Sequence, residues 1–136
     1  MSTDKLASSI GPVSPAIAGP LYQQIIAGIK REISDGRLTA NTPLPSFRAL
    51  AEKLLVSVIT VKRAYEELER EGIIYRRQGL GTFVAEQGLD RSRQSNRQHA
   101  AELIRQALRE AHESGLSSAE LTQFVNQVVN EFIKQS

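Results

Sequence analysis

The chain of 136 residues has no cysteine and only two histidines, His99 and His112, which lie 13 positions apart. Without cysteine it can form neither a disulfide framework nor a thiolate metal site. The spacing of the histidines matches no helical or loop pattern of metal ligands, and no Ser/His/Asp set or pair of catalytic carboxylates stands out. We therefore expect no enzymatic activity, no metal and no cofactor.

Long apolar runs are also lacking. No run approaches the roughly 20 residues needed to cross a bilayer, and no signal-peptide pattern opens the chain. These absences predict a cytoplasmic protein with no membrane partner. The net charge is only +2, so an argument for nucleic-acid binding has to rest on where the charges lie.

The length leaves room for one compact domain and an appendage. Residues 1–19 contain Ser, Pro and Gly with few large side chains, which predicts a flexible N-terminal arm. After Pro20, apolar residues recur every four positions and predict a helix that ends at Gly36. These apolar residues are Leu21, Ile25, Ile29 and Ile33.

Two more helices are predicted, separated by a short turn at Leu55 and Val56. Ser46 is the candidate N-cap of the first and Ser57 that of the second, which ends at Gly72. The buried faces would consist of Leu50, Ala51 and Leu54 in the first helix and of Val61, Ala64, Tyr65 and Leu68 in the second.

A hairpin is predicted next, because two β-prone segments, 73–77 and 82–84, enclose the loop Gln78-Gly79-Leu80-Gly81. The order helix, helix, turn, helix, hairpin is that of a winged helix-turn-helix. The predicted fold class is therefore mainly α with a small β-hairpin, and residues 20–87 form the predicted DNA-binding domain.

The composition changes after Glu86. Residues 88–98 are polar and basic and are expected to act partly as a linker. Two amphipathic helices follow; the first ends at Gly115, and the second begins at Ser117, where Glu120 completes a capping box. The last helix carries a wide apolar stripe made of Leu121, Phe124, Val125, Val128, Val129, Phe132 and Ile133.

A two-helix hairpin cannot bury so wide a stripe alone, so a partner surface is implied. Residues 88–136 are therefore predicted to form a linker and a two-helix dimerisation tail. The residues expected at the dimer interface are Leu121, Phe124, Val125, Val128 and Phe132.

Three segments of the first half resemble the DNA-binding domain of the GntR family of bacterial transcription regulators. They are PLYQQIIAGIKREISDGRL, PLPSFRALAEKLLVSVITVKRAYEELEREGII and GLGTFV. The segment AELIRQALREAHESGLSSAELTQFVNQVV resembles the short helical tail of the YtrA-type subfamily. The resemblance implies a homodimeric regulator, usually a repressor, which binds an operator in double-stranded DNA. A two-fold dimer would require that operator to be palindromic.

The charges of the predicted DNA-binding domain are distributed unevenly. Residues 20–87 contain 10 Lys and Arg against 8 Asp and Glu, so the count alone indicates nothing. However, four of the acids lie late in the third helix: Glu66, Glu67, Glu69 and Glu71. The helix starts and the wing instead collect Arg48, Lys62, Arg63, Arg76 and Arg77. The end of the domain that would meet DNA is therefore predicted to be positive.

The resemblance implies that Arg48, Ser57, Thr60 and Lys62 contact DNA. The guanidinium fork of Arg48 suits a phosphate or a guanine edge. The hydroxyls of Ser57 and Thr60 can bind phosphates or bases, and Lys62 adds a charge that displaces counterions. Arg63 is a further candidate.

Each of these interpretations has a plainer alternative. Arg48 could pair with Glu52 on the surface, and Arg63 could pair with Glu67 four residues further along its helix. Ser57 could serve only as an N-cap, although capping does not exclude a phosphate contact.

Val58 and Ile59 are apolar residues at the exposed start of a helix. In the major groove such side chains can contact thymine methyl groups, so both are candidates for reading sequence. The alternative is that one of them packs against Leu54 or the wing. Phe47 is expected to pack against the helix that follows Pro20.

In the wing, Gly79 and Gly81 allow a positive φ and a close backbone approach. The resemblance implies a DNA contact at Gly79, whereas a turn requirement alone explains Gly81 equally well. The GLGT string lacks Walker spacing and the following Lys, which argues against a nucleotide site. Arg76 and Arg77 lie on opposite faces of a strand, so at most one should meet DNA directly; Arg77 is the candidate.

Two other functions remain open. A winged-helix adaptor for protein partners would not bind an operator and would tolerate loss of Arg48 and Lys62. A sensor would bind an unidentified small-molecule effector in a pocket between the tails.

Overall fold

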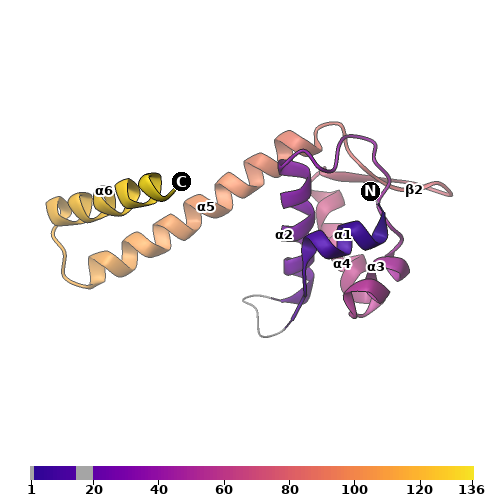
Figure 1. Cartoon of the computed structure of the whole chain (residues 1–136), viewed down its shortest axis with the longest axis horizontal. Coiled ribbons are helices and arrows are strands. Elements are labelled where there is room, and N and C mark those ends of the chain that lie inside the picture. The colour runs from indigo at the N-terminus through magenta and orange to yellow at the C-terminus, as the bar shows by residue number, and fades with distance from the viewer. Residues whose placement is uncertain (1, 15–19) are drawn as a thin grey trace. The chain divides into compact units, whose positions relative to one another are not determined.

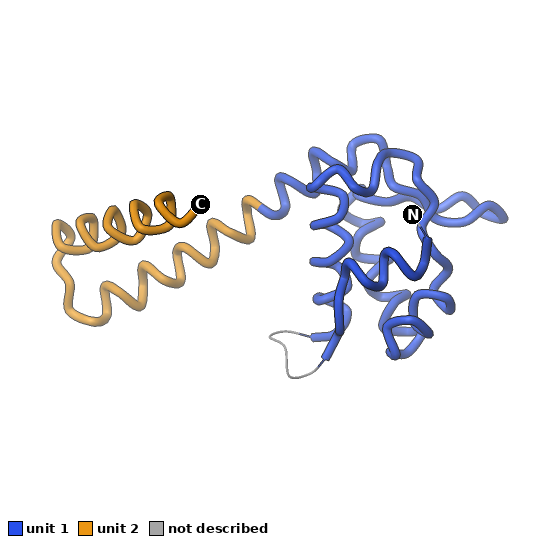
Figure 2. Tube along the Cα trace, in the orientation of Figure 1, with its two compact units in different colours: residues 1–96 blue, residues 97–136 orange. Residues whose placement is uncertain are grey.

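The computed structural model describes residues 2–14 and 20–136. Within these residues it contains six helices and one two-stranded antiparallel sheet. They form two compact units, of which the first ends at Asn96 and the second begins at Arg97 (Figure 2). The expected fold class, mainly α with a small β-hairpin, is confirmed.

The first unit has the element order of a winged helix-turn-helix (Figure 1). The helices of this motif are α2 (Leu21–Ser34), α3 (Phe47–Leu54) and α4 (Val58–Arg70), and its strands are β1 (Ile74–Arg77) and β2 (Gly81–Val84). Ser46 and Ser57 cap α3 and α4 with their side chains, as expected. Between these helices Leu55 adopts φ 58°, so a non-glycine residue makes the left-handed turn that brings α4 against α3.

The core of this unit lies between α2 and α4. The predicted stripe of α2 is buried at Ile25, Ile29 and Ile33, and that of α4 at Val61, Ala64, Tyr65 and Leu68. The two helices run in the same direction: Tyr22 contacts Arg63, and Lys30, eight residues later, contacts Glu71, also eight residues later. The starts of both helices therefore lie on the same side of the unit.

The hairpin is tied to the rest of the unit by a third extended segment. Residues 41–44 lie beside β2, where Leu44 N donates to Thr82 O at 2.8 Å and Val84 N donates to Thr42 O at 3.0 Å. The β1–β2 register pairs Arg77 with Gly81, so the wing loop has three residues rather than the four expected. This attachment fixes the direction in which the wing projects.

The prediction of a flexible arm over residues 1–19 is wrong for its first part; residues 15–19 lie outside the described residues. Helix α1 (Thr3–Ile10) packs on α2 and α3, with Leu6 and Ile10 in the core. Gly28 of α2 makes room for it, since a Cβ there would lie 2.8 Å from Ile10 Cγ1. Leu6 and Ile10 are four positions apart, so they lie on the same face of α1 and bury it although the residues between them are small or polar.

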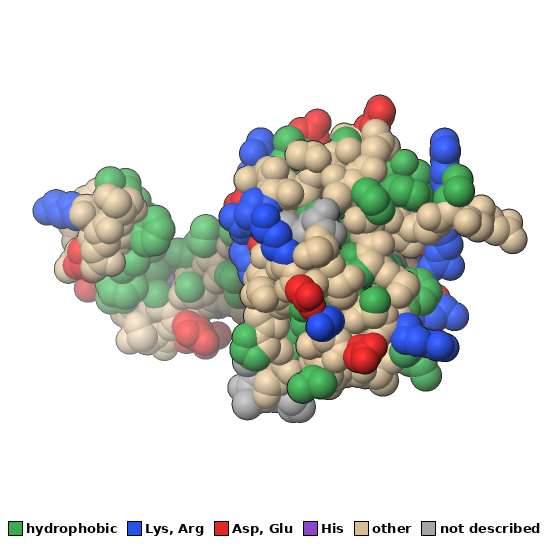
Figure 3. All heavy atoms as spheres, turned by 45° about the vertical axis from the view of Figure 1, so that its right-hand side comes forward, with side chains coloured by type: hydrophobic (Ala, Val, Ile, Leu, Met, Phe, Trp, Pro, Cys, Tyr) green, Lys and Arg blue, Asp and Glu red, His purple; other side chains and the backbone are tan. Residues whose placement is uncertain are grey.

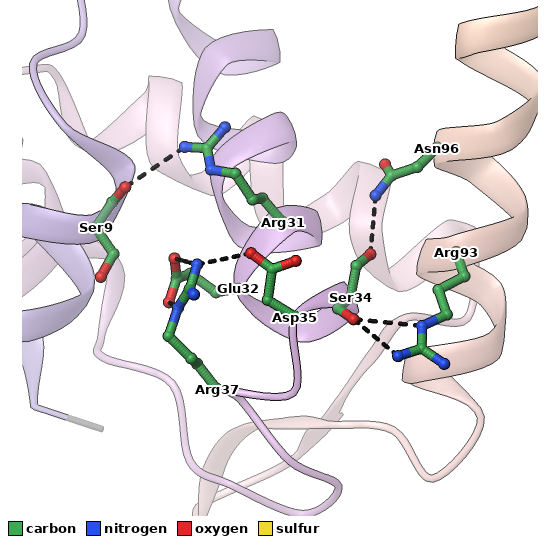
Figure 4. A network of polar contacts seen from close by, with 8 residues as sticks. All are labelled: Ser9, Arg31, Glu32, Ser34, Asp35, Arg37, Arg93 and Asn96. Atoms are coloured by element: carbon green, nitrogen blue, oxygen red, sulfur yellow. Dashed lines mark hydrogen bonds and ion pairs between the residues drawn. The ribbon is translucent and has the colours of Figure 1, made fainter. Parts of the chain in front are cut away.

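The linker expected over residues 88–98 is also wrong. These residues are the first turns of α5 (Gly88–Glu113), in which Gly88 and Ser92 are buried. Their polar side chains hold α5 against the end of α2 (Figure 4). Arg93 Nη2 donates to Ser34 O at 3.2 Å, and Asn96 Nδ2 donates to Ser34 Oγ at 2.8 Å. The polar composition of residues 88–98 therefore reflects hydrogen bonds to α2 and not a flexible linker.

The connector after α2 is held by a buried carboxylate. Glu32, 1% exposed, accepts hydrogen bonds from Arg37 Nε at 2.7 Å and Arg37 Nη2 at 2.8 Å (Figure 4). The Arg37 hydrogen bonds hold the pKa of Glu32 below its usual range, against the opposing effect of burial. Arg37 also pairs with Asp35, so one guanidinium closes the turn that leads to residues 41–44.

The second unit consists of the remainder of α5 and of α6 (Ser118–Gln135). Ser117 and Glu120 form the predicted capping box at the start of α6. No side chain from 97 to 136 is buried, so this unit has no core of its own in a single chain. Among the described residues, no helix combines the length and apolarity needed to span a membrane.

Replacement of Leu6 tests whether α1 is part of the core. Leu6→Ala should lower the free energy of unfolding by about 2–5 kcal/mol, because it leaves a cavity where Leu6 is 0% exposed. Leu55→Ala is the matched control; with Leu55 90% exposed, it should change the value by less than about 0.5 kcal/mol. Urea denaturation measures both, and equal effects would show that α1 is not packed as described.

Candidate nucleic-acid interface

The start of α4 presents hydroxyl groups. Ser57 Oγ accepts a hydrogen bond from Thr60 N at 3.2 Å and lies 2.8 Å from Thr60 Oγ1. Capping by Ser57 is therefore confirmed. It leaves the remaining hydrogen-bonding capacity of the two hydroxyls for an outside group, and contact with DNA stays a prediction.

The first turn of α4 also exposes its two apolar residues. Ile59 is 77% exposed and Val58 is 42% exposed. The alternative in which Ile59 packs against Leu54 or the wing is not what the structure shows. Ile59 is therefore free of the core and available to an outside group, and its contact with thymine stays a prediction.

The cations of the first unit fall into two groups. Four are neutralised by acids in the described part of the chain: Lys30 by Glu71, Arg37 by Glu32 and Asp35, Lys53 by Asp4, and Arg70 by Glu67. Nine exposed ones form no ion pair with a described acid. Four of these lie on α1, the last turn of α2 and α5, namely Lys5, Arg31, Arg91 and Arg93, and the three arginines among them donate to backbone carbonyl oxygens. The other five lie on α3, α4 and the wing: Arg48, Lys62, Arg63, Arg76 and Arg77. In the space-filling view, Lys and Arg side chains gather beside the protruding hairpin (Figure 3).

These five are the cations that the sequence placed at the helix starts and the wing. Neither alternative pairing occurs among the described residues: Arg48 does not pair with Glu52, and Glu67 is taken by Arg70 instead of Arg63. A concentration of unpaired, exposed positive charge on one part of a nearly neutral unit is an arrangement suited to a polyanion.

Arg63 is held by an aromatic residue that sequence reasoning missed. Its guanidinium lies 3.9 Å from the centre of the Tyr22 ring, and Arg63 Nη2 donates to Tyr22 Oη at 3.3 Å. Tyr22 comes from α2 and is separated from Arg63 by 41 positions. No local sequence pattern indicates this contact; it follows from the parallel packing of α2 on α4.

The two wing arginines lie in different surroundings. Arg76 stacks over Phe47, with 5.1 Å from Cζ to the ring centre, whereas Arg77 is exposed at the end of β1 opposite Gly81. Phe47, expected to pack against the helix after Pro20, has its ring 5.2 Å from that of Tyr65 of α4, edge to face.

The wing tip is built on left-handed glycines. Gly79 has φ 78° and Gly81 has φ 119°, and no atom lies within 4 Å of a Cβ built on either. Within the chain these glycines are therefore required by backbone conformation rather than by close packing. The turn requirement is confirmed for both residues, and contact of Gly79 with DNA stays a prediction.

The predicted interface residues of the tail all lie on α6. Leu121 and Val125 are half-buried, whereas Phe124, Val128 and Phe132 are exposed, Phe132 by 70%. Leu103, Ile104, Val129 and Ile133 of the same unit are exposed as well. The hairpin thus covers one side of its apolar stripe and leaves the other uncovered.

Comparison with known proteins gives this geometry a context. The family described as "Bacterial regulatory proteins, gntR family" matches residues 21–84. The chain is also 31% identical over 116 residues to the HTH-type transcriptional repressor YtrA of Bacillus subtilis (strain 168), an alignment that covers 85% of this chain and 89% of YtrA. The chain belongs to the GntR family. Its relatives in this family are transcriptional regulators rather than enzymes.

Two solved structures of transcriptional regulators extend the similarity beyond the DNA-binding unit. A GntR family transcriptional regulator from Listeria monocytogenes is 34% identical, with a TM-score of 0.66 over 81% of this chain and 96% of that one. A transcriptional regulator from Oenococcus oeni is 30% identical, with a TM-score of 0.68 over 85% of this chain and 99% of that one. The coverage goes well past residue 84. The resemblance to YtrA-type GntR proteins is confirmed.

The role of Ile59 can be tested on DNA. If Ile59 contacts thymine methyl groups, replacement of thymine by uracil in the bound half-site should weaken binding by about 1 kcal/mol. The same replacement should have a smaller effect on an Ile59→Ser variant, which has no apolar group at this position and keeps only Val58. Fluorescence anisotropy titration measures both, and a variant that remains equally sensitive to uracil would contradict the assignment.

Proposed function

We propose that this GntR protein is a repressor that binds a palindromic operator in double-stranded DNA as a homodimer. The observation that carries the proposal is the group of five exposed cations on α3, α4 and the wing that form no ion pair with a described acid. The cytoplasmic location expected from the sequence is where a bacterial operator would be met.

The docking follows from the fold. The start of α4 enters the major groove, α3 crosses the backbone, and the wing lies over the neighbouring phosphates or minor groove. Val58 and Ile59 then face base edges, while Arg48, Ser57, Thr60, Lys62 and Arg63 approach phosphates and base edges on either side. Gly79 brings the backbone of the wing tip close to the DNA.

Repression is supported by a relative whose alignment covers 85% of this chain, because YtrA of Bacillus subtilis is named a transcriptional repressor. A small protein of this kind can repress by occupying its operator. This requires affinity and specificity for that DNA sequence, but neither a catalytic site nor a surface that activates transcription. An unidentified small-molecule effector that releases the operator remains a candidate partner, and a ligand thermal-shift screen would reveal it.

The homodimer is supported by the apolar surface of the tail. Full burial of a large apolar side chain contributes roughly 1.5–3 kcal/mol, and α6 leaves Phe124, Val128, Val129, Phe132 and Ile133 exposed. A second copy of the same chain can cover this surface, because in a two-fold dimer the same patch of each subunit packs against the other. Such a dimer presents two copies of α4 at a fixed separation and so requires two inverted half-sites.

Selection of bound sequences from a random DNA library tests the function directly. We expect two inverted half-sites, with centres about 34 Å apart or at another constant distance set by the tails. Enrichment of a single half-site without a partner would contradict the dimer, and no enrichment at all would favour the rival function, a winged-helix adaptor for proteins.

Charge placed on the apolar face of α6 should separate the subunits. Phe132→Asp should sediment as a monomer at micromolar concentration and bind the palindrome at least tenfold more weakly, because a carboxylate cannot be buried in an apolar interface. Asn130→Asp, which adds the same charge on the polar side of α6, is the control and should remain dimeric. A dimeric Phe132→Asp protein would rule out this interface.

A chain that ends at Asn96 provides a second check by sedimentation. It keeps Gly88 and Ser92 in the first unit, where both are buried, and a break at Glu86 would remove them. We expect it to fold, to sediment as a monomer and to bind one half-site weakly. A dimer formed by this shortened chain would place the interface outside the tail.

A further inference from the structure

A column of three side chains joins the wing to the helices of the first unit. The guanidinium of Arg76 lies over the ring of Phe47, and the Phe47 and Tyr65 rings meet edge to face. Tyr65 is fixed in turn, because its hydroxyl donates to Pro45 O at 2.8 Å and the ring is 1% exposed. Burial raises the pKa of Tyr65, so the phenol keeps the proton it donates.

This column holds Arg76 at the start of α3. Phe47 is the first residue of α3, directly after the N-cap Ser46 and directly before Arg48. Arg76 therefore reaches from β1 to the first residue of α3, whose neighbour in the chain, Arg48, is exposed.

The way Arg76 is held leaves its hydrogen-bonding groups available. The ring contact occupies none of the five N–H donors of the guanidinium, and no hydrogen bond from Arg76 to a described residue takes them up. The cations held by acids in this unit, such as Arg37 on Glu32, have donors occupied and charge neutralised. Arg76 has neither, since no described acid pairs with it.

We propose that Arg76 contacts the DNA phosphate backbone between the groove entered by α4 and the wing, and that Phe47 is its positioning residue. This rests on the proposed DNA-binding function. It names Arg76, rather than Arg77, as the wing arginine that meets DNA, a choice that strand alternation alone leaves open. Arg77 extends from the end of β1, and no aromatic ring of the described structure lies beneath it. Binding through Arg77 would therefore have to restrict a flexible side chain, and this loss of conformational entropy reduces the free energy of binding.

Salt dependence of DNA binding by the full chain tests the contact. The probes are a duplex with the selected operator and a scrambled duplex of the same length, titrated from about 50 to 200 mM KCl. Arg76→Gln should weaken binding to both duplexes and lower the slope of log Kd against log salt by about one unit for each bound protomer. Arg70→Gln removes the same charge from the last turn of α4, where Arg70 pairs with Glu67, and should keep the slope unchanged.

The positioning role of Phe47 has a separate signature. Phe47→Leu keeps an apolar side chain on Tyr65 but removes the ring face, so binding should weaken roughly two- to fivefold with the slope unchanged, since the charge of Arg76 remains. In the Arg76→Gln background, Phe47→Leu should not weaken binding further. Phe47→Tyr in the unaltered protein should keep full affinity, because it keeps the aromatic ring. Thermal unfolding of each variant shows whether the fold is kept.

The outcomes separate this proposal from the proposed function. If the unaltered protein binds neither duplex, the function itself fails, and this proposal with it. If it binds but Arg76→Gln has the slope of the unaltered protein, the contact is overturned while the function stands, whatever Arg77→Gln does. If Phe47→Leu weakens binding equally with and without Arg76, the positioning role is overturned, because a purely structural effect does not depend on that arginine.

Discussion

The parallel packing of α2 on α4 is the constraint from which the rest of the first unit follows. The apolar stripes of the two helices, Ile25, Ile29 and Ile33 against Val61, Ala64 and Leu68, bury each other and set the register. Because the helices run in the same direction, their starts share one side of the unit, where Tyr22 meets Arg63. Their ends share the other side, where Lys30 meets Glu71 and α5 begins.

That arrangement also sorts the charges. Toward the ends of α2 and α4, acids and cations neutralise one another, as Arg37 does with Glu32 and Arg70 does with Glu67. Toward the starts and the wing, cations are instead supported by aromatic rings, Arg63 by Tyr22 and Arg76 by Phe47. A ring orders a guanidinium without cancelling its charge. A chain of net charge +2 can therefore present a strongly positive surface to a polyanion.

The second unit poses a different physical problem. None of its side chains is buried, yet its helices carry apolar residues along their length. Capping at Ser117 and Glu120 shapes α6 but supplies little stability compared with burial of an apolar face. The tail is thus a structure whose stability depends on association, and association in turn fixes how many DNA-binding units act together.

Local sequence determined the helices, their caps, the hairpin and the inward stripes, because period, N-cap chemistry and glycine stops act over a few residues. It also gave the candidate contacts at the start of α4 and the exposed face of α6. It failed for α1 and for residues 88–98, because Ile10 packs on Gly28 and Arg93 donates to Ser34, both of which lie in α2 and far away in the chain. Only the tertiary structure decided that Tyr22 supports Arg63 and Phe47 supports Arg76, since contacts between residues some 30 to 40 positions apart arise from helix packing and leave no pattern in a single sequence.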